Sequence, residues 1–327
     1  MIELINVIKS YRGAPRNAVD DVSLEIETGT TVALIGPSGC GKTTTMRMIN
    51  RLQTPTSGQI LVNGKDVNTV DPQTLRRSIG YVIQQVGLFP HMTIAQNVAT
   101  VLRLLKHDAV KIKERVSELL QMVGLDPDEM GPRLPQALSG GQRQRVGFAR
   151  ALAGDPDVML MDEPFGAIDP ITRTKVQSEF KEILKKTNKT VVMVTHDLDE
   201  ALKMADRVAI MQDGKLMQYD TPIDILARPN SSFVADFLGA DRALKQLGLI
   251  TVQSVMSAPQ ISNDPVVGPL ANLQFALSEI LATNAYGLVV RDNDGPVLGY
   301  LDRATLLSSV ASAAHLGSES IHIKGKK

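Results

Sequence analysis

The sequence contains no tryptophan, a single cysteine, no excess of either charge and no long apolar run. Because Cys40 has no second cysteine to pair with, an intrachain disulfide is excluded, which suits a reducing compartment. The 35 basic and 35 acidic residues balance, and this argues against nucleic-acid binding, which usually requires a basic excess. The chain has no apolar signal-peptide core and no run near the roughly 18 apolar residues of a membrane span. If the protein acts at a membrane, we therefore expect another protein to anchor it there.

Short apolar runs alternate with amphipathic stretches along the first 240 residues. Because polar or turn residues bound each run, we expect buried strands there, several of them parallel. The runs are TVALI, IGYVI, DVMLMD, TVVMVT and RVAIMQ, near 31–35, 79–83, 157–162, 190–195 and 207–212. The alternation predicts an α/β domain over 1–240. Its stretch from 87 to 136 lacks a convincing strand, so we expect a helical subdomain over about 87–145.

A second, smaller unit is expected after a linker over 241–250. Residues 251–310 combine a helical pattern, LQFALSEILATN, with two apolar runs that flank Asp294 and Gly295. An Asp-Gly pair between apolar runs predicts a hairpin, so the unit is expected to be α+β. The remaining residues, 311–327, are small and polar and are expected to form a flexible tail.

The stretch after the first predicted buried strand matches the pattern G-x-x-x-x-G-K-[ST] of a phosphate-binding loop, known as Walker A. Its glycines allow successive backbone N–H groups to surround phosphate oxygens, and the following helix directs its positive end at the same anion. Lys42 is expected to reach the β and γ phosphates, Thr43 to bind Mg²⁺ and Thr44 to contact a phosphate. The alternative is a glycine-rich turn without a ligand. The predicted ATP-binding residues are Gly36, Pro37, Ser38, Gly39, Cys40, Gly41, Lys42, Thr43 and Thr44.

Two carboxylates end the apolar run VMLMDE. We expect Asp162 to hold Mg²⁺, as the aspartate of a Walker B motif does, and Glu163 to polarise a water molecule. An apolar run that ends in Asp-Glu is common on its own. The Walker A loop upstream makes the functional interpretation the stronger one.

The stretch LSGGQRQRVGFARAL, which begins at Leu138, is a second turn that opens a basic helix and could bind an anion. It resembles the signature motif of ATP-binding cassette (ABC) ATPases. The resemblance implies a P-loop NTPase fold of the RecA-like ABC type, with ATP and Mg²⁺ as cofactors. It also implies that two copies pair head to tail, so that each signature motif caps the ATP of the other chain. The residues assigned to that role in trans are Ser139, Gly140, Gly141 and Gln142.

The same resemblance, which covers roughly residues 1–240, assigns the remaining site residues. Gln84 matches the glutamine that touches Mg²⁺ and the attacking water, with Gln85 as the alternative register. His196, in VTHD, matches the histidine that contacts the γ-phosphate. Glu163, His196 and Gln84 are thus the expected catalytic residues, and Thr43, Gln84 and Asp162 the expected metal ligands.

Two further residues follow from the resemblance. Tyr11 matches the aromatic residue that stacks on adenine, and the alternative is a tyrosine on an edge strand. Asp169, in GAIDP, matches the D-loop aspartate, which acts in trans. The family more often has Ser and Leu where Gly166 and Ile168 stand, which is a mild departure.

Several stretches resemble the ATPases of osmoprotectant importers more closely. They are KTTTMRMINRLQTPTSGQI, YVIQQVGLFPHMTIAQNV, MDEPFGAIDPITR and FVADFLGADRALKQLGLI. The resemblance implies an ATPase subunit on the cytoplasmic face of the cell membrane, bound to integral-membrane permease subunits and serving a solute-binding protein indirectly. The solute would be glycine betaine, choline, carnitine or a proline-type compound. Alternatives are an importer of a polyamine or iron complex, a regulatory module without turnover, and a nucleic-acid-associated ABC protein.

The second unit is similar to a cystathionine-β-synthase-type (CBS) motif at two places, TVQSVMSAP and GPVLGYLDRATLL. Such motifs normally work as pairs, and one is present here. Nucleotide-binding copies usually have Thr or Ser followed by Asp near the end. Here Asp302 precedes Thr305 instead. The sequence therefore leaves two possible signals for this module, a nucleotide or ionic strength.

Overall fold

The structure, a computed structural model, describes residues 1–84, 87–166, 168–293 and 295–309. Its Cα positions divide the chain into two compact units, Met1–Met217 and Gln218–Lys327. This division falls earlier than the end of the predicted 1–240 domain. The first unit contains every residue that the sequence assigns to the nucleotide site.

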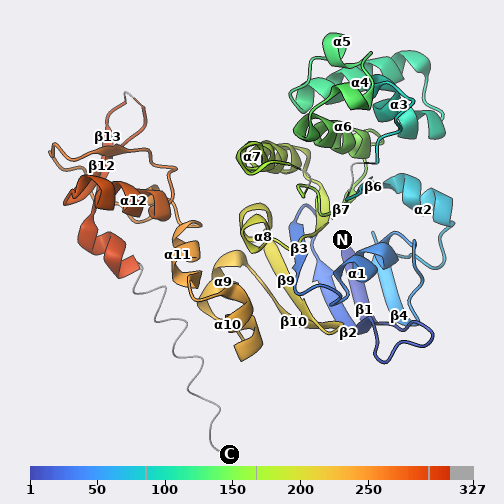
Figure 1. Ribbon diagram of the computed structural model, residues 1–327, viewed down its shortest axis with the longest axis horizontal. Coiled ribbons are helices and arrows are strands. Elements are labelled where there is room, and N and C mark those ends of the chain that lie inside the picture. Colours follow the sequence, from blue (N-terminus) through green and yellow to red (C-terminus); the bar gives the residue numbers. More distant parts are fainter. Residues whose placement is uncertain (85–86, 167, 294, 310–327) are drawn as a thin grey trace, which may run out of the picture. The chain divides into compact units, whose positions relative to one another are not determined.

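The first unit is built on a six-stranded sheet with the strand order β10-β9-β3-β8-β7-β6, whose strand β10 extends beyond Met217 (Figure 1). β3 is parallel to β8 and β9, and β7 is parallel to β6 and β8. All residues of β3, β7 and β8 are buried, as expected for parallel strands covered on both faces. The five predicted strands are therefore confirmed. The strands are β3 (Thr31–Ile35), β6 (Ile79–Val82), β7 (Val158–Asp162), β8 (Thr190–Val194), β9 (Arg207–Gln212) and β10 (Lys215–Asp220).

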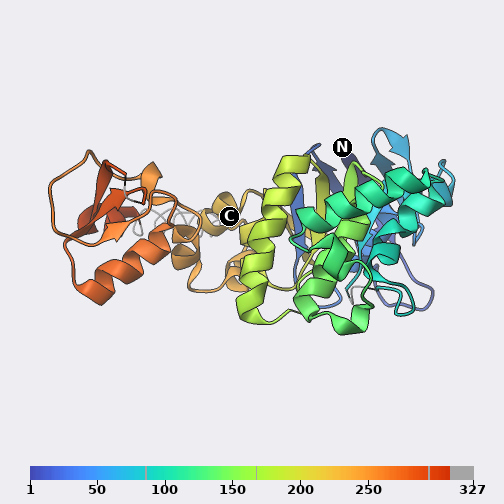
Figure 2. The same ribbon diagram turned by 90° about the horizontal axis from the view of Figure 1, so that it is seen from above.

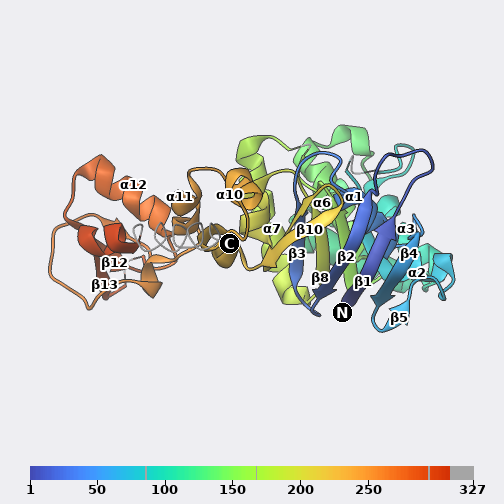
Figure 3. The ribbon, with the colours of Figure 1, turned by 90° about the horizontal axis from the view of Figure 1, so that it is seen from below.

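A second, antiparallel sheet with the order β2-β1-β4-β5 was not predicted from the sequence. Figure 3 shows β1, β2 and β4 side by side. The regular alternation that would reveal β1 is broken by irregular pairing near Asn6, whose φ is 45°. Gly58 faces this point, where an added Cβ would lie 2.3 Å from the carbonyl oxygen of Asn6. The strands are β1 (Ile2–Lys9), β2 (Val19–Ile26), β4 (Ser57–Val62) and β5 (Lys65–Asp66).

The stretch between β6 and β7 is helical, as predicted, and its helices lie together in Figures 1 and 2. α3 packs against α4 and α6. The buried face of α3 includes Ile94, Val98 and Leu102, at the spacing of one helix face. α6 continues beyond the predicted end of this subdomain near 145. The elements are α3 (Ile94–Leu104), α4 (Ala109–Met122), α5 (Pro127–Met130), the 3₁₀ helix η1 (Pro135–Ala137) and α6 (Gly140–Leu152).

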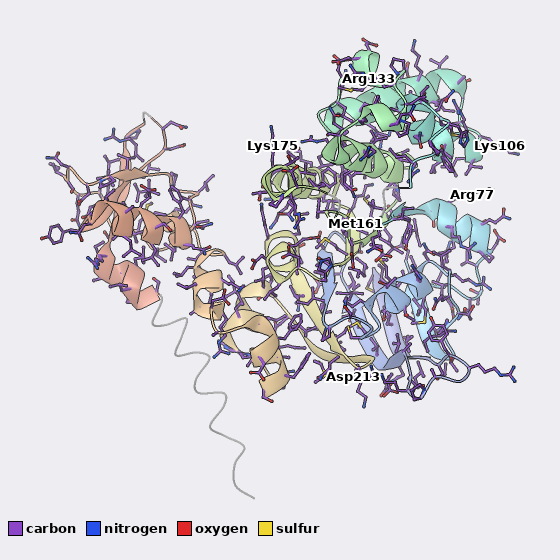
Figure 4. The ribbon with its side chains drawn as sticks, in the orientation of Figure 1. Arg77, Lys106, Arg133, Met161, Lys175 and Asp213 are labelled. Carbon is purple, nitrogen blue, oxygen red and sulfur yellow. The ribbon has the colours of Figure 1, made fainter. Side chains whose placement is uncertain are left out.

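Four more helices lie among the described residues of the first unit. Asp71, Asp169 and Asp197 cap the starts of α2, α7 and α8 with their side chains, which satisfies backbone N–H groups that a helix start leaves unpaired. In Figure 4 the Met161 side chain lies within the fold, whereas Arg77 marks the outer side of α2. The helices are α1 (Lys42–Ile49), α2 (Pro72–Ser78), α7 (Pro170–Thr187) and α8 (Leu198–Met204).

The second unit has its own small core, which includes Leu247, Val252, Ile280 and Leu288. Its sheet has the order β11-β12-β13, and β12 pairs with β13 antiparallel, which confirms the predicted hairpin. Asp294 of the predicted turn lies outside the described residues, as do Val310 and the predicted tail. The elements are α9 (Pro222–Ala227), α10 (Ser232–Leu238), α11 (Arg242–Leu247), η2 (Val252–Ser254), β11 (Val266–Val267), α12 (Leu273–Thr283), β12 (Gly287–Arg291) and β13 (Val297–Asp302), and residues 303–309 are helical.

Candidate nucleotide site

The loop between β3 and α1 needs glycine at two positions. Gly36 and Gly41 have φ values of 144° and 106°, which L side chains rarely adopt. A Cβ at Gly36 would lie 2.1 Å from the carbonyl oxygen of Met211, and a Cβ at Gly41 would lie 2.3 Å from that of Ala18. Neighbouring backbone therefore fixes this loop, and no larger residue would fit without moving it.

Lys42 lies at the centre of the loop. Its side chain is buried, and its Nζ donates to the carbonyl oxygens of Gly36 at 2.7 Å and Pro37 at 2.9 Å. Gly41 forms the N-cap of α1 without a side-chain hydrogen bond to the first turn. A helix start that lacks such a cap presents N–H groups and a positive dipole end to an anion. The ammonium group and the helix start thus offer positive charge at one place.

A pocket opens at this loop. It is lined by Ala18, Gly39, Cys40, Gly41, Lys42, Thr43 and Thr44. Six of these seven residues are among those predicted to bind ATP. Of the rest of that set, Gly36 and Pro37 hold Lys42, and Ser38 is exposed on the loop.

The two predicted metal ligands with the most suitable oxygens are close together. Thr43 Oγ1 lies 3.4 Å from Asp162 Oδ1. Burial raises the pKa of Asp162, and the charge of Glu163 adds to this effect, while Arg47 opposes it from 4.0 Å. A buried carboxylate beside a hydroxyl is a donor pair that suits Mg²⁺, and a cation there would offset the cost of burying the charge. No cluster of three or more His, Cys, Asp or Glu residues suited to a metal occurs among the described residues, so other oxygens would have to complete the coordination.

The three predicted catalytic residues meet at the ends of adjacent parallel strands. Gln84 Nε2 donates to Glu163 Oε2 at 2.7 Å, and His196 Nδ1 lies 3.4 Å from Glu163 Oε1. Glu163 itself has a φ of 47°, and its N–H donates to the carbonyl oxygen of Val194 at 2.9 Å. Its side chain is 25% exposed and that of His196 is 67% exposed. The Glu163 carboxylate is therefore fixed in orientation and still accessible to water.

A second pocket beside this group contains residues that were not predicted. It is lined by Arg47, Leu52, Gln53, Tyr81, Ile83, Gln84 and Asp162. Arg47 lies one helical turn after Thr43, a spacing that could have indicated its position near the metal ligands. Burial raises the pKa of Tyr81, and Asp162 adds to this effect.

Ser139 and Gln142 form a capping box at the start of α6. The Gln142 N–H donates to Ser139 Oγ at 3.2 Å, and the Ser139 N–H donates to Gln142 Oε1 at 2.9 Å. At Gly141 an added Cβ would lie 3.1 Å from Thr172 Cγ2 of α7, so the helices approach closely there. Gly140 is the first residue of α6. Within one chain the motif thus stabilises the helix start, and any role toward a second chain is additional.

The last two predicted residues lie in loops. Tyr11 is 41% exposed and follows the end of β1, so it is not part of an edge strand. The Lys9 Nζ lies over its ring, 5.2 Å from the ring centroid. Asp169 Oδ1 accepts the Thr172 N–H at 3.0 Å as the N-cap of α7. Gln85, the alternative to Gln84, lies outside the described residues.

Glu200 is a buried acid near the site that the sequence did not single out. It is 5% exposed, and burial, with a contribution from Asp197, raises its pKa from 4.5 to about 7. The spacing Asp197-x-x-Glu200 indicates a helix start, because the Asp197 side chain accepts the Glu200 N–H, but it does not indicate that Glu200 is buried.

We expect the ionisation of Glu200 to weaken the fold as the pH rises. The folded state holds this proton more tightly than the unfolded state, so the stabilisation is complete below pH 4.5 and is lost as the pH rises through about 7. The pKa difference corresponds to at most about 3 kcal/mol. Glu200→Gln should therefore raise the melting temperature at pH 8 and have little effect at pH 4.5. Asp199→Asn, an exposed neighbour on α8, is the control. An equal effect of Glu200→Gln at both pH values would contradict the expectation.

Comparison with known proteins adds to this geometry. Residues 19–166 match the family model described as ABC transporter. The chain is 48% identical over 307 residues to the osmoprotectant import ATP-binding protein OsmV of Salmonella typhimurium, covering 93% of this chain and 79% of that protein. It is 49% identical over 304 residues to the carnitine transport ATP-binding protein OpuCA of Listeria monocytogenes, covering 92% of this chain and 75% of that protein. A solved dimeric ATP-binding cassette in a post-hydrolysis state, bound to ADP and Pi, shares 35% identity at a TM-score of 0.61, covering 68% of this chain and 99% of that structure.

Proposed function

Because the chain belongs to the family of ABC transporter ATP-binding proteins, we propose that it hydrolyses ATP to drive import of an osmoprotectant such as glycine betaine, carnitine or choline. It is an ATPase whose reaction is coupled to transport. Relatives named for osmoprotectant and carnitine import match more than nine-tenths of this chain. This coverage favours a quaternary amine over the alternative solutes, a polyamine or an iron complex.

The observation that carries the enzymatic function is the position of Glu163 between Gln84 and His196. The carboxylate is held at 2.7 Å by an amide N–H and lies 3.4 Å from an imidazole nitrogen. A binding module without turnover has no need for an oriented and accessible carboxylate beside a phosphate loop. Phosphoryl transfer depends on positioning and on stabilising charge, and these residues would position the attacking water.

The nucleotide would occupy the Walker A loop. The Lys42 ammonium would form hydrogen bonds with the β and γ phosphates, either in place of its hydrogen bonds to the loop carbonyl oxygens or in addition to them. The backbone N–H groups of the loop and of the start of α1 would bind phosphate oxygens, and Thr44 would donate a hydrogen bond. Tyr11 is proposed to stack on adenine, which its exposed ring permits.

Mg²⁺ is proposed to bind at Thr43, Asp162 and Gln84. The 3.4 Å approach of Thr43 and Asp162 and the burial of the Asp162 carboxylate, which a cation would compensate, support this assignment. Bound there, the ion would neutralise charge on the phosphates. The Arg47 Nη2, which lies 4.0 Å from Asp162 Oδ2, would help to orient that carboxylate.

A second copy of the chain is the proposed partner at the nucleotide. Ser139, Gly140, Gly141, Gln142 and Asp169 of each copy would contact the ATP of the other. The solved cassette that resembles this chain is dimeric, which supports the pairing of two copies. The start of α6 would then add its dipole to the site opposite Lys42.

Integral-membrane permease subunits are the proposed membrane partner, with a solute-binding protein acting indirectly. None of the helices in the described part of the chain has the length and hydrophobicity of a membrane span. We place the protein at the cytoplasmic face of the cell membrane through that partner. Phe89, which is 40% exposed and follows Gln84 by five positions, offers an apolar contact for the permease close in sequence to a catalytic residue.

Residues 251–310 are proposed to be a CBS-type regulatory module. The Asp302 carboxylate accepts the Thr305 N–H at 2.7 Å and the Thr305 hydroxyl at 2.6 Å. Both oxygens thus serve to cap the helix at 303–309.

Solute-stimulated hydrolysis tests the proposed function. In the complex of this chain with its permease and solute-binding protein, we expect glycine betaine, carnitine or choline to raise the ATPase rate several-fold, because solute binding is coupled to the nucleotide site. Spermidine and ferric citrate should leave the rate unchanged. Stimulation by spermidine or ferric citrate alone would instead identify one of the alternative solutes.

A further inference from the structure

The residues proposed to act on the ATP of the other chain lie at the starts of two different helices. Asp169 is the N-cap of α7, and the start of α6 holds Ser139, Gly140, Gly141 and Gln142. Groups that act on one reacting phosphate must be held in a fixed geometry. The contacts that place α6 relative to α7 therefore bear on the reaction.

α6 and α7 pack against each other through close apolar contacts. Near their starts, an added Cβ at Gly141 would lie 3.1 Å from Thr172 Cγ2. About two turns further along both helices, the buried rings of Phe148 and Phe180 stack with their centroids 4.0 Å apart. The two helices therefore run in the same direction, with both starts at one end of the contact. Apolar burial is non-directional, so a directional contact would fix their register more firmly.

Arg145 and Glu179 supply a directional contact between the same two helices. Arg145 Nη2 forms an ion pair with Glu179 Oε2, a buried oxygen to which the described residues give no hydrogen bond of ordinary geometry. The Arg145 side chain is only 14% exposed, and its Nη1 donates to the carbonyl oxygen of Val123, the C-cap of α4, at 2.7 Å. One guanidinium group on α6 therefore joins α7 and the end of α4. Such a pair adds little net stability, because desolvation offsets the attraction, but it can specify one arrangement.

Each of the two loops is attached to its own helix. Asp169 Oδ1 accepts the Thr172 N–H at 3.0 Å, and Arg173 Nη2 donates to the carbonyl oxygen of Ile168 at 3.0 Å. Ser139 is held at the start of α6 by the capping box. A shift of α7 along α6 would therefore move Asp169 relative to Ser139.

We propose that Arg145 is a positioning residue that, through its ion pair with Glu179, sets the register of α6 against α7 and so places both helix starts over the ATP of the other chain. The inference rests on the proposed ATPase function and on its shared site. Loss of the ion pair changes neither the phosphate loop nor Glu163 of the same chain, so that chain still binds ATP. It displaces the residues supplied to the other chain, so kcat falls.

Steady-state hydrolysis by Glu179→Gln, in the full chain bound to its permease, is the first test. The amide keeps the size of the side chain and removes its charge. We expect kcat to fall by about threefold to tenfold, because small displacements of positioned groups slow a reaction strongly, while the ATP affinity of the chain alone stays unchanged. Glu182→Gln makes the same change at an exposed position three residues later on α7 and should keep the full kcat. Equal kcat values for the two variants would overturn the inference.

A double-mutant cycle tests whether the ion pair is the cause. Arg145→Met also loses the hydrogen bond to Val123, so it should lower kcat at least as far as Glu179→Gln does. If the two side chains act as a pair, adding Glu179→Gln to Arg145→Met should cause little further loss. Losses that multiply in the double variant would show that the two residues act independently and would contradict the inference.

Complexes of two different chains, isolated with two affinity tags, show whether the pair acts on the other chain. When one chain carries Lys42→Ala, the working site combines the phosphate loop of the other chain with α6 and α7 of the Lys42→Ala chain. Glu179→Gln should lower the rate when it is placed in the Lys42→Ala chain and leave it unchanged when it is placed in the other chain. A general loss of stability would act equally in both arrangements, so equal rates would overturn the inference. Absence of hydrolysis by the unaltered complex would instead contradict the proposed ATPase function, so the two failures are distinguishable.

Discussion

Glu163→Gln is expected to bind ATP with nearly unchanged affinity and to lose at least about 100-fold in steady-state turnover. The amide keeps the shape of the side chain and can still contact Gln84, so the site should remain intact. It lacks the negative charge that orients and polarises the attacking water. The loss therefore falls on the chemical step and leaves binding largely as it was.

Nucleotide binding and phosphate release, measured on the same preparation, check this expectation. Glu182→Gln is the matched control, because it makes the same change at an exposed position on α7. Turnover of Glu163→Gln within a few-fold of the unaltered chain would show that another group orients the water.

Mixing two inactive variants is expected to restore activity if the site is shared between chains. Lys42→Ala removes the buried ammonium group of the phosphate loop, and Ser139→Arg blocks the start of α6 on the opposite side of the proposed site. Each homodimer has two damaged sites. A mixed dimer has one site with both lesions and one intact site, so an equal mixture should recover up to about a quarter of the unaltered rate.

The controls for this experiment separate folding from function. Lys42→Ala alone should bind ATP at least about 100-fold more weakly, because a charge paired with the phosphates is lost. Lys175→Ala, an exposed lysine on α7 that Figure 4 labels, should bind ATP normally. Failure of the mixture to recover any activity, although crosslinking shows that mixed dimers form, would contradict the shared site.

The individual motifs could be predicted from the sequence because each is local. The loop at 36–43 combines glycines, Lys42 and Thr43 within one turn between a strand and a helix, and the structure places them as the pattern requires. The apolar runs that became β3, β7 and β8 were recognisable because strands buried on both faces need continuous apolar sequence.

The convergence of Gln84, Glu163 and His196 required more than local patterns. The three follow β6, β7 and β8, and these strands are neighbours in the sheet. The sequence predicts the strands but does not contain their order, so the family resemblance carried this part of the prediction. β1 escaped detection because an irregularity near Asn6 disrupts its alternation.

Burial of a polar residue by distant elements is a further property that the sequence does not reveal. From the sequence alone, Glu200 resembles an ordinary exposed acid in the first turn of a helix, where acids are common. It becomes buried because α8 packs against β3 and α7. Arg173 likewise joins Ile168 to Asp197 across two loops that are separated by nearly thirty residues.

Solute uptake into proteoliposomes tests the central claim most directly. The vesicles would contain this chain with its permease, ATP on the side of the ATPase and the solute-binding protein with labelled glycine betaine, carnitine or choline on the other side. We expect ATP-dependent accumulation of at least one of these solutes by the unaltered chain and by Glu182→Gln, and none by Glu163→Gln. Accumulation by Glu163→Gln equal to that of the unaltered chain, or hydrolysis by the unaltered complex without uptake of any of the three solutes, would contradict the account.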